Sequence, residues 1–532
     1  MKRKAGLWIV GYLVLVLALL VPVAVLTVRV DPFFHYHKPD TDKYYYQLDN
    51  QRSQNDGIIR NFDYTGLITG TSLTENFRTS EAEALWGGQF IKVPFSGATF
   101  RETNESIEAA LRCNPELSIV IRGIESWRLL SDKDGLREDL GDFPTYLYDD
   151  DPLNDVEYVL NRDVVFERIY PMLLKASEPG FVGGITSFDR YFNWSGKYAY
   201  GKNALFPDGV EPVETPERVY HLTDRGRQIT LDNVTQNLTA VADAHPDVTF
   251  YYFFTPYSAK FWMEKLADGT LERTVESERV AIEELLLHPN IRLYSFNDQF
   301  DLTTDLNNYK DYIHYGGWVN SMILRYMQEG KCLLTRDNYE AYLDRVLSFY
   351  TAYDYSRLSE QEDYTVDAYA ALLLAERTGG PTEQRTLELQ SGELRNAAIV
   401  PDQYEGSDGV VCRGSLPIDY RDRQTILSNY LRDTDYIGVK FTIDDIEPYS
   451  LITFYGRKCA DHGQPTVFVY DADGNAVVAC RMSYRDLSGE WTRYMIDVNK
   501  LYGPATVIFH GGYIDNSGDP GSEYVFSRIS LF

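Results

Sequence analysis

The chain has 532 residues and a formal net charge of −28 at pH 7. This acidic balance argues against nucleic acid and anionic lipid surfaces as partners, because both attract basic proteins. The five cysteines are scattered and lack the spacing of a metal site, so we expect no bound metal. A chain of this length exceeds one ordinary hydrophobic core, and we therefore expect two folded domains.

The N-terminus predicts a membrane anchor. Lys2, Arg3 and Lys4 precede an uncharged apolar run over residues 5–28, long enough to cross a hydrocarbon core of roughly 30 Å as a helix. The basic flank predicts a cytoplasmic N-terminus. A cleaved signal peptide is the alternative, but its apolar region usually has about 7 to 15 residues before a small-residue cleavage site. We expect residues 1–29 to form a basic tip and a single transmembrane helix of the cell membrane, with the bulk of the chain extracellular.

Residues 30–335 predict an α/β domain. Short β-branched or aromatic runs alternate with longer amphipathic stretches, a pattern typical of a mostly parallel sheet covered on both faces. Residues from about 130 to 220 break this alternation, and we expect an insertion that walls a substrate cleft. The predicted strands are 64–70, 90–94, 117–124, 248–256 and 291–296, and the clearest predicted helices are 103–113, 222–245 and 276–288.

The C-terminal third has a different character. Residues 336–385 predict a helical linker made of two helices, over 338–355 and 367–380. From residue 386 to residue 532, short runs alternate apolar and polar side chains, which predicts an all-β sandwich of jelly-roll-like form. A carbohydrate-binding role for this sandwich is expected by analogy of shape only.

Ser72 is the first candidate for chemistry. It stands in "LITGTSLTENF", directly after the first predicted strand of the α/β domain. Ligands bind at the carboxyl edge of open α/β sheets, and a serine there can present its hydroxyl to a cleft. The alternative is structural, because Thr71 or Ser72 can also serve as a helix N-cap.

Asp311 and His314 are the second candidate. They lie three positions apart in "NNYKDYIHYGGW", after the last predicted strand of the sheet. A serine hydroxyl is a weak nucleophile that needs a base, and the base needs an acid to orient it. We therefore expect Ser72, His314 and Asp311 to meet as nucleophile, general base and orienting acid.

These blocks resemble the SGNH (GDSL-like) hydrolase superfamily, whose first block is Gly-Asp-Ser after strand one and whose last is Asp-x-x-His. Here the first block reads Gly70-Thr71-Ser72. The second block supplies a glycine to the oxyanion hole, and "VPFSGAT" makes Gly97 the candidate. The resemblance implies a three-layer α/β/α fold and an oxyanion hole formed by the N–H groups of Ser72 and Gly97.

The third block departs from the family pattern. Gly-x-Asn-Asp is expected after strand three, but "IRGIESW" keeps only Gly123 and has Glu125 and Ser126 at the Asn and Asp positions. The departure implies one fewer oxyanion donor, and loss of one such donor typically lowers the rate by about 10²–10³.

Within the superfamily, the chain is most similar to exported, membrane-anchored branches. These include the D-alanyl transfer protein of teichoic-acid modification and the alginate O-acetyltransferase group. The resemblance implies a serine esterase or O-acyltransferase that acts on an acylated cell-wall or capsular polysaccharide or a teichoic-acid-like polymer. It also implies a membrane acyl-donor protein as partner and no metal or organic cofactor. The alternative is a non-catalytic SGNH-like binding or scaffold protein of envelope polymer biosynthesis.

Overall fold

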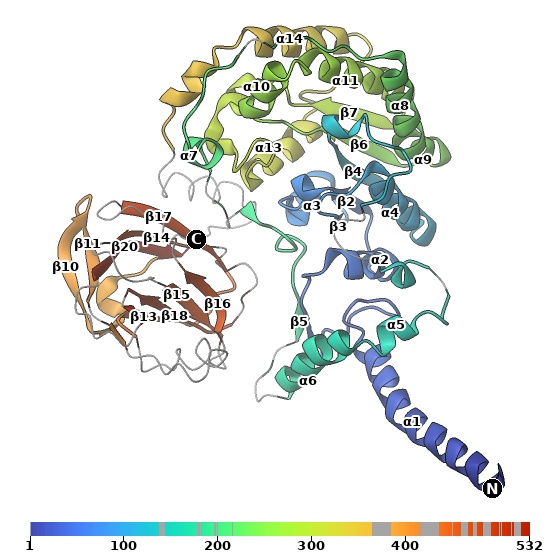
Figure 1. Ribbon diagram of the computed structural model, residues 1–532, viewed down its shortest axis with the longest axis vertical. Coiled ribbons are helices and arrows are strands. Elements are labelled where there is room, and N and C mark those ends of the chain that lie inside the picture. The colour runs from blue at the N-terminus through green and yellow to red at the C-terminus, as the bar shows by residue number, and fades with distance from the viewer. Residues whose placement is uncertain are drawn as a thin grey trace. The chain divides into compact units, whose positions relative to one another are not determined.

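The computed structural model divides into two compact units, Met1–Asn193 with Tyr200–Asp363, and Trp194–Ala199 with Tyr364–Phe532. The first contains the α/β domain and the second the β domain (Figure 1). The structure describes residues 2–137, 144–149, 151–177, 181, 183–195, 198, 200–214, 216–363, 385–413, 415–416, 436–449, 451–458, 466–471, 476–481, 491–498, 501, 503–511, 513–514 and 523–531.

A five-stranded parallel sheet forms the centre of the α/β unit. The strand order is β3-β2-β4-β6-β7, and every neighbouring pair is parallel. Nearly every residue in these strands is buried, as a sheet covered on both faces requires. The five predicted strands are thereby confirmed, with slightly shorter bounds: β2 Gly66–Gly70, β3 Phe90–Pro94, β4 Ile119–Ile124, β6 Thr249–Phe254 and β7 Ile291–Ser295.

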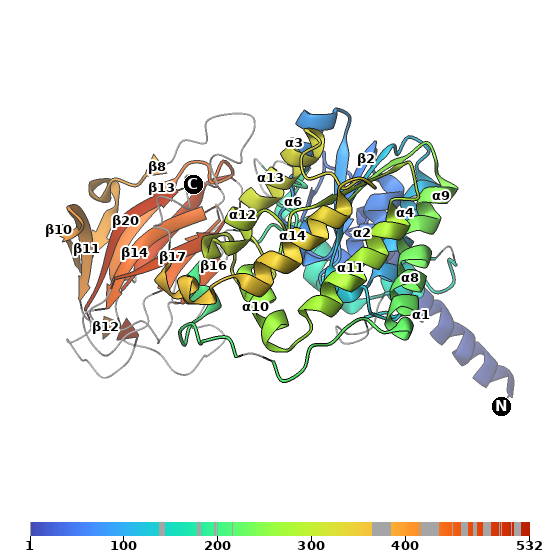
Figure 2. The ribbon, with the colours of Figure 1, turned by 90° about the horizontal axis from the view of Figure 1, so that it is seen from above.

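The order of the strands creates a topological switch point between β2 and β4. From β2 the chain crosses to β3 on one side through α3, and it then returns to β4 on the other side through α4. Helices α3 and α13 lie on one face of the sheet, and α4, α8 and α9 lie on the other, as both views show (Figures 1 and 2). The loops that follow β2 and β4 therefore diverge at one edge, which is where open α/β sheets bind ligands.

The helices of this unit begin where the sequence supplies caps. Helix α4 starts after Thr99, whose hydroxyl accepts from the Glu102 N–H while the Glu102 carboxylate accepts from the Thr99 N–H, a capping box. The α-helices of the unit are α1 Lys2–Val30, α2 Gln51–Asn61, α3 Thr79–Trp86, α4 Phe100–Cys113, α5 Val156–Val159, α6 Tyr170–Ala176, α7 Lys202–Leu205, α8 Asp224–Val234, α9 Ala240–Ala244, α10 Ala259–Ala267, α11 Leu271–Leu285, α12 Phe300–Thr304, α13 Gly317–Gln328 and α14 Tyr339–Ala352.

Helix α1 is the one described helix that is long and apolar enough to cross a membrane. Its apolar stretch runs from Trp8 to Val30 with a mean hydropathy of 2.9. A signal sequence would meet the same criteria of length and composition. The predicted insertion after residue 130 contains α5, a π-helical segment η4 (Val164–Ile169), α6 and the short strand β5 (Gly184–Ile185), which pairs with β1 (Tyr45–Tyr46).

The first helix of the predicted linker is part of the α/β unit. Helix α14 packs against α10 and α11, and the Tyr350 ring stacks on Trp262 with a centroid separation of 4.6 Å. Its apolar face is thus covered by the domain before it, which a sequence pattern of local periodicity does not reveal. The second predicted helix, over 367–380, lies outside the described residues.

The β unit is a sandwich of two antiparallel sheets, as predicted. One sheet has the order β10-β11-β20-β14-β17, with β8 on β20, and the other has the order β16-β15-β18-β13-β9. Side chains from both sheets, among them Phe454, Phe526 and Val507, form one buried core. The strands of the two sheets are β8 Arg385–Thr386, β9 Glu393–Arg395, β10 Ala397–Tyr404, β11 Ser407–Arg413, β13 Gly438–Ile443, β14 Leu451–Lys458, β15 Thr466–Tyr470, β16 Ala476–Arg481, β17 Trp491–Asp497, β18 Ala505–His510 and β20 Glu523–Leu531.

Candidate active site

Ser72 lies at the carboxyl edge of the sheet, two residues after the end of β2. It opens a single 3-10 turn, η1 (Ser72–Thr74), and its side chain is half-buried. Gly70, the last residue of β2, has φ +147°, and a Cβ there would come within 2.6 Å of Thr74 Cγ2. A side chain at position 70 would therefore displace the turn, so the glycine of the first block is required by the backbone.

The structure brings Ser72, His314 and Asp311 together. Ser72 Oγ lies 2.8 Å from His314 Nε2, although the two residues are 242 positions apart in sequence. On the other side of the ring, His314 Nδ1 lies 2.8 Å from Asp311 Oδ2 and 3.0 Å from Oδ1. A proton on Nδ1 shared with the carboxylate leaves Nε2 free to accept the serine proton. This is the geometry of a nucleophile, a base and an orienting acid.

Asp311 is held as a carboxylate. Partial burial acts to raise its pKa, but hydrogen bonds from the His314 ring and from the backbone N–H groups of His314 and Ile313 outweigh burial, so the pKa lies below its usual value. Lys310 Nζ adds a cation 3.8 Å from Asp311 Oδ2. An ionised Asp311 is what an orienting and charge-stabilising role beside an imidazole needs.

Two buried polar side chains fasten the histidine segment to the serine turn. Asn320 Nδ2 donates to the Leu73 carbonyl at 2.9 Å, and the Tyr315 hydroxyl donates to the same oxygen at 3.4 Å. Asn320 stands in the first turns of α13, within the apolar run "WVNSMIL". Sequence reasoning missed this contact, and the signal that could have found it is a lone amide in an otherwise apolar helix face.

Gly97 follows β3 and has a backbone conformation that favours glycine. Its φ is +67°, and a Cβ would overlap the Arg137 guanidinium. Its carbonyl accepts a hydrogen bond from Arg128 Nη2 at 2.9 Å. The preceding Ser96 N–H donates to Gln51 Oε1 at 2.7 Å. The predicted oxyanion residue is thus fixed by neighbours on both sides, at the same sheet edge as Ser72.

A buried carboxyl joins the loop of Gly97 to the turn of Ser72. Glu75 Oε1 accepts hydrogen bonds from Ser96 Oγ and from Gln51 Nε2, and Lys92 Nζ donates to the backbone carbonyls of Glu75 and Phe77. Burial raises the pKa of Glu75 above its usual value. Burial also lowers the pKa of Lys92 to about 7. The sequence analysis did not predict this buried network, although Glu75 and Ser96 lie within the stretches that contain Ser72 and Gly97.

The third-block residues Glu125 and Ser126 are buried inside the protein. A Cβ added to Gly123 would lie 3.2 Å from Thr74 Cγ2. Strand β4 therefore comes close to the turn that contains Ser72. Glu125 is buried, its Oε1 accepts from the Thr71 hydroxyl, and its Oε2 lies 3.6 Å from Arg128 Nε. A carboxylate can only accept hydrogen bonds. Glu125 therefore cannot act as the expected oxyanion donor, and it instead holds Thr71, the residue before Ser72, by a hydrogen bond.

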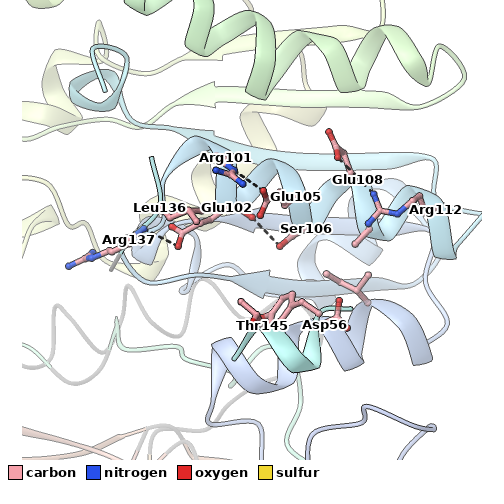
Figure 3. Close-up of a pocket in the computed structure, with 13 residues that line it drawn as sticks. Asp56, Arg101, Glu102, Glu105, Ser106, Glu108, Arg112, Leu136, Arg137 and Thr145 are labelled. Atoms are coloured by element: carbon pink, nitrogen blue, oxygen red, sulfur yellow. Dashed lines mark hydrogen bonds and ion pairs between the residues drawn. The ribbon is translucent and has the colours of Figure 1, made fainter. Parts of the chain in front are cut away.

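A cavity lies beside this site. A volume of about 830 Å³ opens along α4 and is lined by Arg101, Glu105 and Arg137 among others, but by none of the three triad residues (Figure 3). Its charged side chains pair within the wall, as Arg101 does with Glu105 at 2.8 Å. Chemistry needs a nucleophile and a base, so we place the candidate active site at Ser72. Arg137 belongs to both places, since it lines the cavity and covers Gly97.

No family model and no curated protein match the chain. Among solved structures, the chain is similar to a family 6 carbohydrate-binding module from Clostridium cellulolyticum in complex with xylose, at 11% identity over 28% of this chain and 96% of the module, with a TM-score of 0.19. It is also similar to a "putative platelet activating factor" from Streptococcus pneumonia, at 10% identity over 55% of this chain and 91% of that one, with a TM-score of 0.27. TM-scores below 0.5 do not establish a shared fold, so the function of this chain has to rest on its own residues.

Proposed function

We propose that this protein is a membrane-anchored, extracytoplasmic serine esterase or O-acyltransferase of the SGNH type. The observation that carries the proposal is the 2.8 Å approach of Ser72 Oγ to His314 Nε2, with the Asp311 carboxylate on the far side of the ring. This arrangement supports acyl transfer, because each group stands where the next proton movement needs it. The anchor is α1, whose length and apolarity suit a membrane span.

In the proposed mechanism, Ser72 Oγ attacks the carbonyl carbon of an ester and transfers its proton to His314 Nε2. Asp311 stabilises the resulting imidazolium through Nδ1. The N–H groups of Ser72 and Gly97 receive the oxyanion of the tetrahedral intermediate. His314 then protonates the leaving alcohol, and the acyl group stays on Ser72 as an ester. Water or a second hydroxyl, activated by neutral His314, releases the acyl group and restores the serine.

We propose an acylated cell-envelope glycopolymer as the substrate. The proposal extends the family resemblance, and the β unit supplies an independent observation in its favour. In the larger sheet, the half-buried Tyr404 ring lies 4.1 Å from the buried Tyr455 ring and 5.0 Å from the half-buried Trp491 ring. Arg457 and Arg528 lie against these rings. Aromatic faces beside guanidinium donors are suited to sugar rings and their anionic substituents.

A fluorophosphonate probe tests the catalytic part of the proposal. The full chain in detergent should be labelled, and Ser72→Ala should abolish labelling. Ser118→Ala is the matched control, since Ser118 lies exposed at the amino end of β4, on the opposite edge of the same sheet. Wild-type protein that resists the probe, or labelling that survives in Ser72→Ala, would contradict the esterase and favour the non-catalytic scaffold. If Ser72 is labelled, release of acetyl or alanyl groups from candidate wall polymers identifies the acyl group.

A further inference from the structure

Helix α5 and the segment η4 of the insertion are attached to the end of α1. The Tyr158 hydroxyl donates to Asp31 Oδ1 at 2.7 Å, and Thr27 Oγ1 donates to the Val159 carbonyl at 3.0 Å. The Phe33 and Tyr158 rings stack with centroids 5.4 Å apart. These contacts fix the position of α5 relative to the last turns of α1.

The burial of α1 changes abruptly at this attachment. Side chains from Trp8 to Val25 are mostly exposed, whereas Thr27 and Val30 are fully buried under α5 and η4. A bilayer core of roughly 30 Å needs about 20 helical residues. Counted from the basic tip, such a span ends near residue 25, where protein contacts replace exposure. With α1 as the proposed anchor, the attachment of α5 would lie at the outer surface of the bilayer.

Five apolar side chains of this segment are exposed. Phe166, Tyr170 and Leu174 follow one another at intervals of four residues through η4 and α6, so they share one helical face. Leu153, just before α5, and Val156, at its first position, are exposed as well. Their exposed fractions lie between 49% and 83%. Exposed apolar side chains that cluster in this way usually mark an interaction surface.

We propose that the face formed by Phe166, Tyr170 and Leu174 inserts into the outer surface of the lipid bilayer as a second membrane contact. The inference rests on the anchoring role proposed for α1, because the attachment to α1 sets the height of this face. A lipid surface fits better than a protein partner, since η4 and α5 are attached to the outer end of the helix proposed to span the membrane. Amphipathic helices of this kind lie in the plane of the interface.

The proposed contact has a consequence for catalysis. A chain tethered by one helix alone would rotate and tilt freely above the membrane. A second contact fixed to the same unit restricts that freedom and holds the sheet edge with Ser72 at a constant height. The charges around the face are mixed, with Arg162 and Arg168 beside Asp163 and Glu167. The contact should therefore depend on apolar insertion and not on anionic lipid.

Photo-cross-linking in vesicles tests this inference. The full chain is reconstituted into phosphatidylcholine vesicles that contain a phosphatidylcholine with a diazirine in its acyl chain, and is irradiated and digested with trypsin. Cleavage after Arg162, Arg168 and Lys175 separates the peptide with Phe166 from the peptide with Tyr170 and Leu174. Both peptides and α1 should carry lipid adducts, with the same yield when one third of the lipid is anionic. The peptide over 280–292 is the control, because Leu287 is 56% exposed and lies far from α1 in sequence.

A triple variant, Phe166→Gln with Tyr170→Gln and Leu174→Gln, identifies the side chains responsible. Adducts in the two peptides should fall roughly tenfold while those in α1 persist, since polar side chains do not enter the acyl region. Fluorophosphonate labelling of the variant reports that the domain remains folded. Adducts in α1 without adducts in these peptides, or equal adducts in the triple variant, would overturn the inference. Absence of adducts from α1 itself would instead contradict the anchor in the proposed function.

Discussion

The hydroxyl of Thr71 donates a hydrogen bond to the buried carboxylate of Glu125. This contact joins the residue before the proposed nucleophile to the loop after β4, across the switch point of the sheet. Glu125 stands where the SGNH pattern has the Asn that donates to the oxyanion. Its carboxylate is a hydrogen-bond acceptor and already accepts from Thr71. In the proposed mechanism, backbone N–H groups alone stabilise the oxyanion, and Glu125 positions Thr71.

Two substitutions of Glu125 should distinguish the effect of its hydrogen bond to Thr71 from the effect of its negative charge. Glu125→Ala leaves the Thr71 hydroxyl without its acceptor, and loss of a buried hydrogen-bond partner costs about 1–3 kcal/mol. The displaced turn should lower kcat roughly ten- to hundredfold. Glu125→Gln keeps a carbonyl acceptor and should retain most activity. Ester hydrolysis and thermal unfolding of both variants check this; equal losses in the two would show that the charge is the important feature.

Substitution at Gly97 should expose two separable costs. In Gly97→Ala, the methyl group meets the Arg137 guanidinium, and the left-handed backbone adds about 1–2 kcal/mol of strain. Arg137→Ala alone should leave kcat near the wild-type value. The double variant should recover the part of activity lost to the clash, but not the part lost to backbone strain. Full recovery in the double variant would mean that only space, and not conformation, requires glycine here.

The Asn320 amide should be needed as a donor. Its Nδ2 bonds the Leu73 carbonyl at 2.9 Å, so Asn320→Asp places an acceptor against an acceptor. Asn320→Asp should react more slowly with fluorophosphonate than Asn320→Ala at pH 8, because a buried carboxylate repels the carbonyl oxygen and resists desolvation. The difference between the two variants should narrow at pH 5, where the buried acid is protonated. A pH-independent difference would contradict this explanation.

Glu278 should make stability depend on pH. Burial raises its pKa to about 7, against hydrogen bonds from Ser126 and Tyr342. The native state therefore binds this proton more tightly than the unfolded state, and stability falls as pH rises from about 4.5 through 7. Glu278→Gln should remove this fall, so that the variant gains up to about 3 kcal/mol relative to the wild type above pH 7. Thermal unfolding at pH 5 and pH 8.5 measures it; parallel pH profiles would contradict the prediction.

Asp311→Asn should abolish the proposed ester hydrolysis while leaving the fold intact. In Ser-His-Asp triads the corresponding change lowers kcat by about 10⁴, because the imidazole takes the wrong tautomer. The pKa of Asp311 is lower in the folded state than in the unfolded state. The ionised carboxylate therefore stabilises the fold above the unfolded pKa, and this stabilisation is lost as pH falls through the folded pKa. The difference in melting temperature between variant and wild type should therefore shrink in acid. Retained ester hydrolysis in Asp311→Asn would exclude Asp311 from the triad.

Local sequence pattern was sufficient to predict the strands of the sheet and to single out Ser72 and the pair Asp311 and His314 as candidates. The five strands of the α/β unit were predicted because strands buried on both faces read as continuous β-branched and aromatic runs. The β-sandwich was predicted from period-two alternation. The packing of α14 was not, since the periodicity of a helix shows that one face is apolar but not which domain covers it.

The sequence by itself determined which chemical groups are available: Ser72 after the first strand, the spaced pair Asp311 and His314 after the last, and an apolar N-terminal run. Only the tertiary structure decided that Ser72 Oγ and His314 Nε2 meet at 2.8 Å, and that Glu125 faces Thr71. The reason is physical. Strand runs and motif spacing are set by neighbours along the chain, whereas a hydrogen bond across 242 positions depends on the order and parallel direction of the strands that bring both segments to one edge.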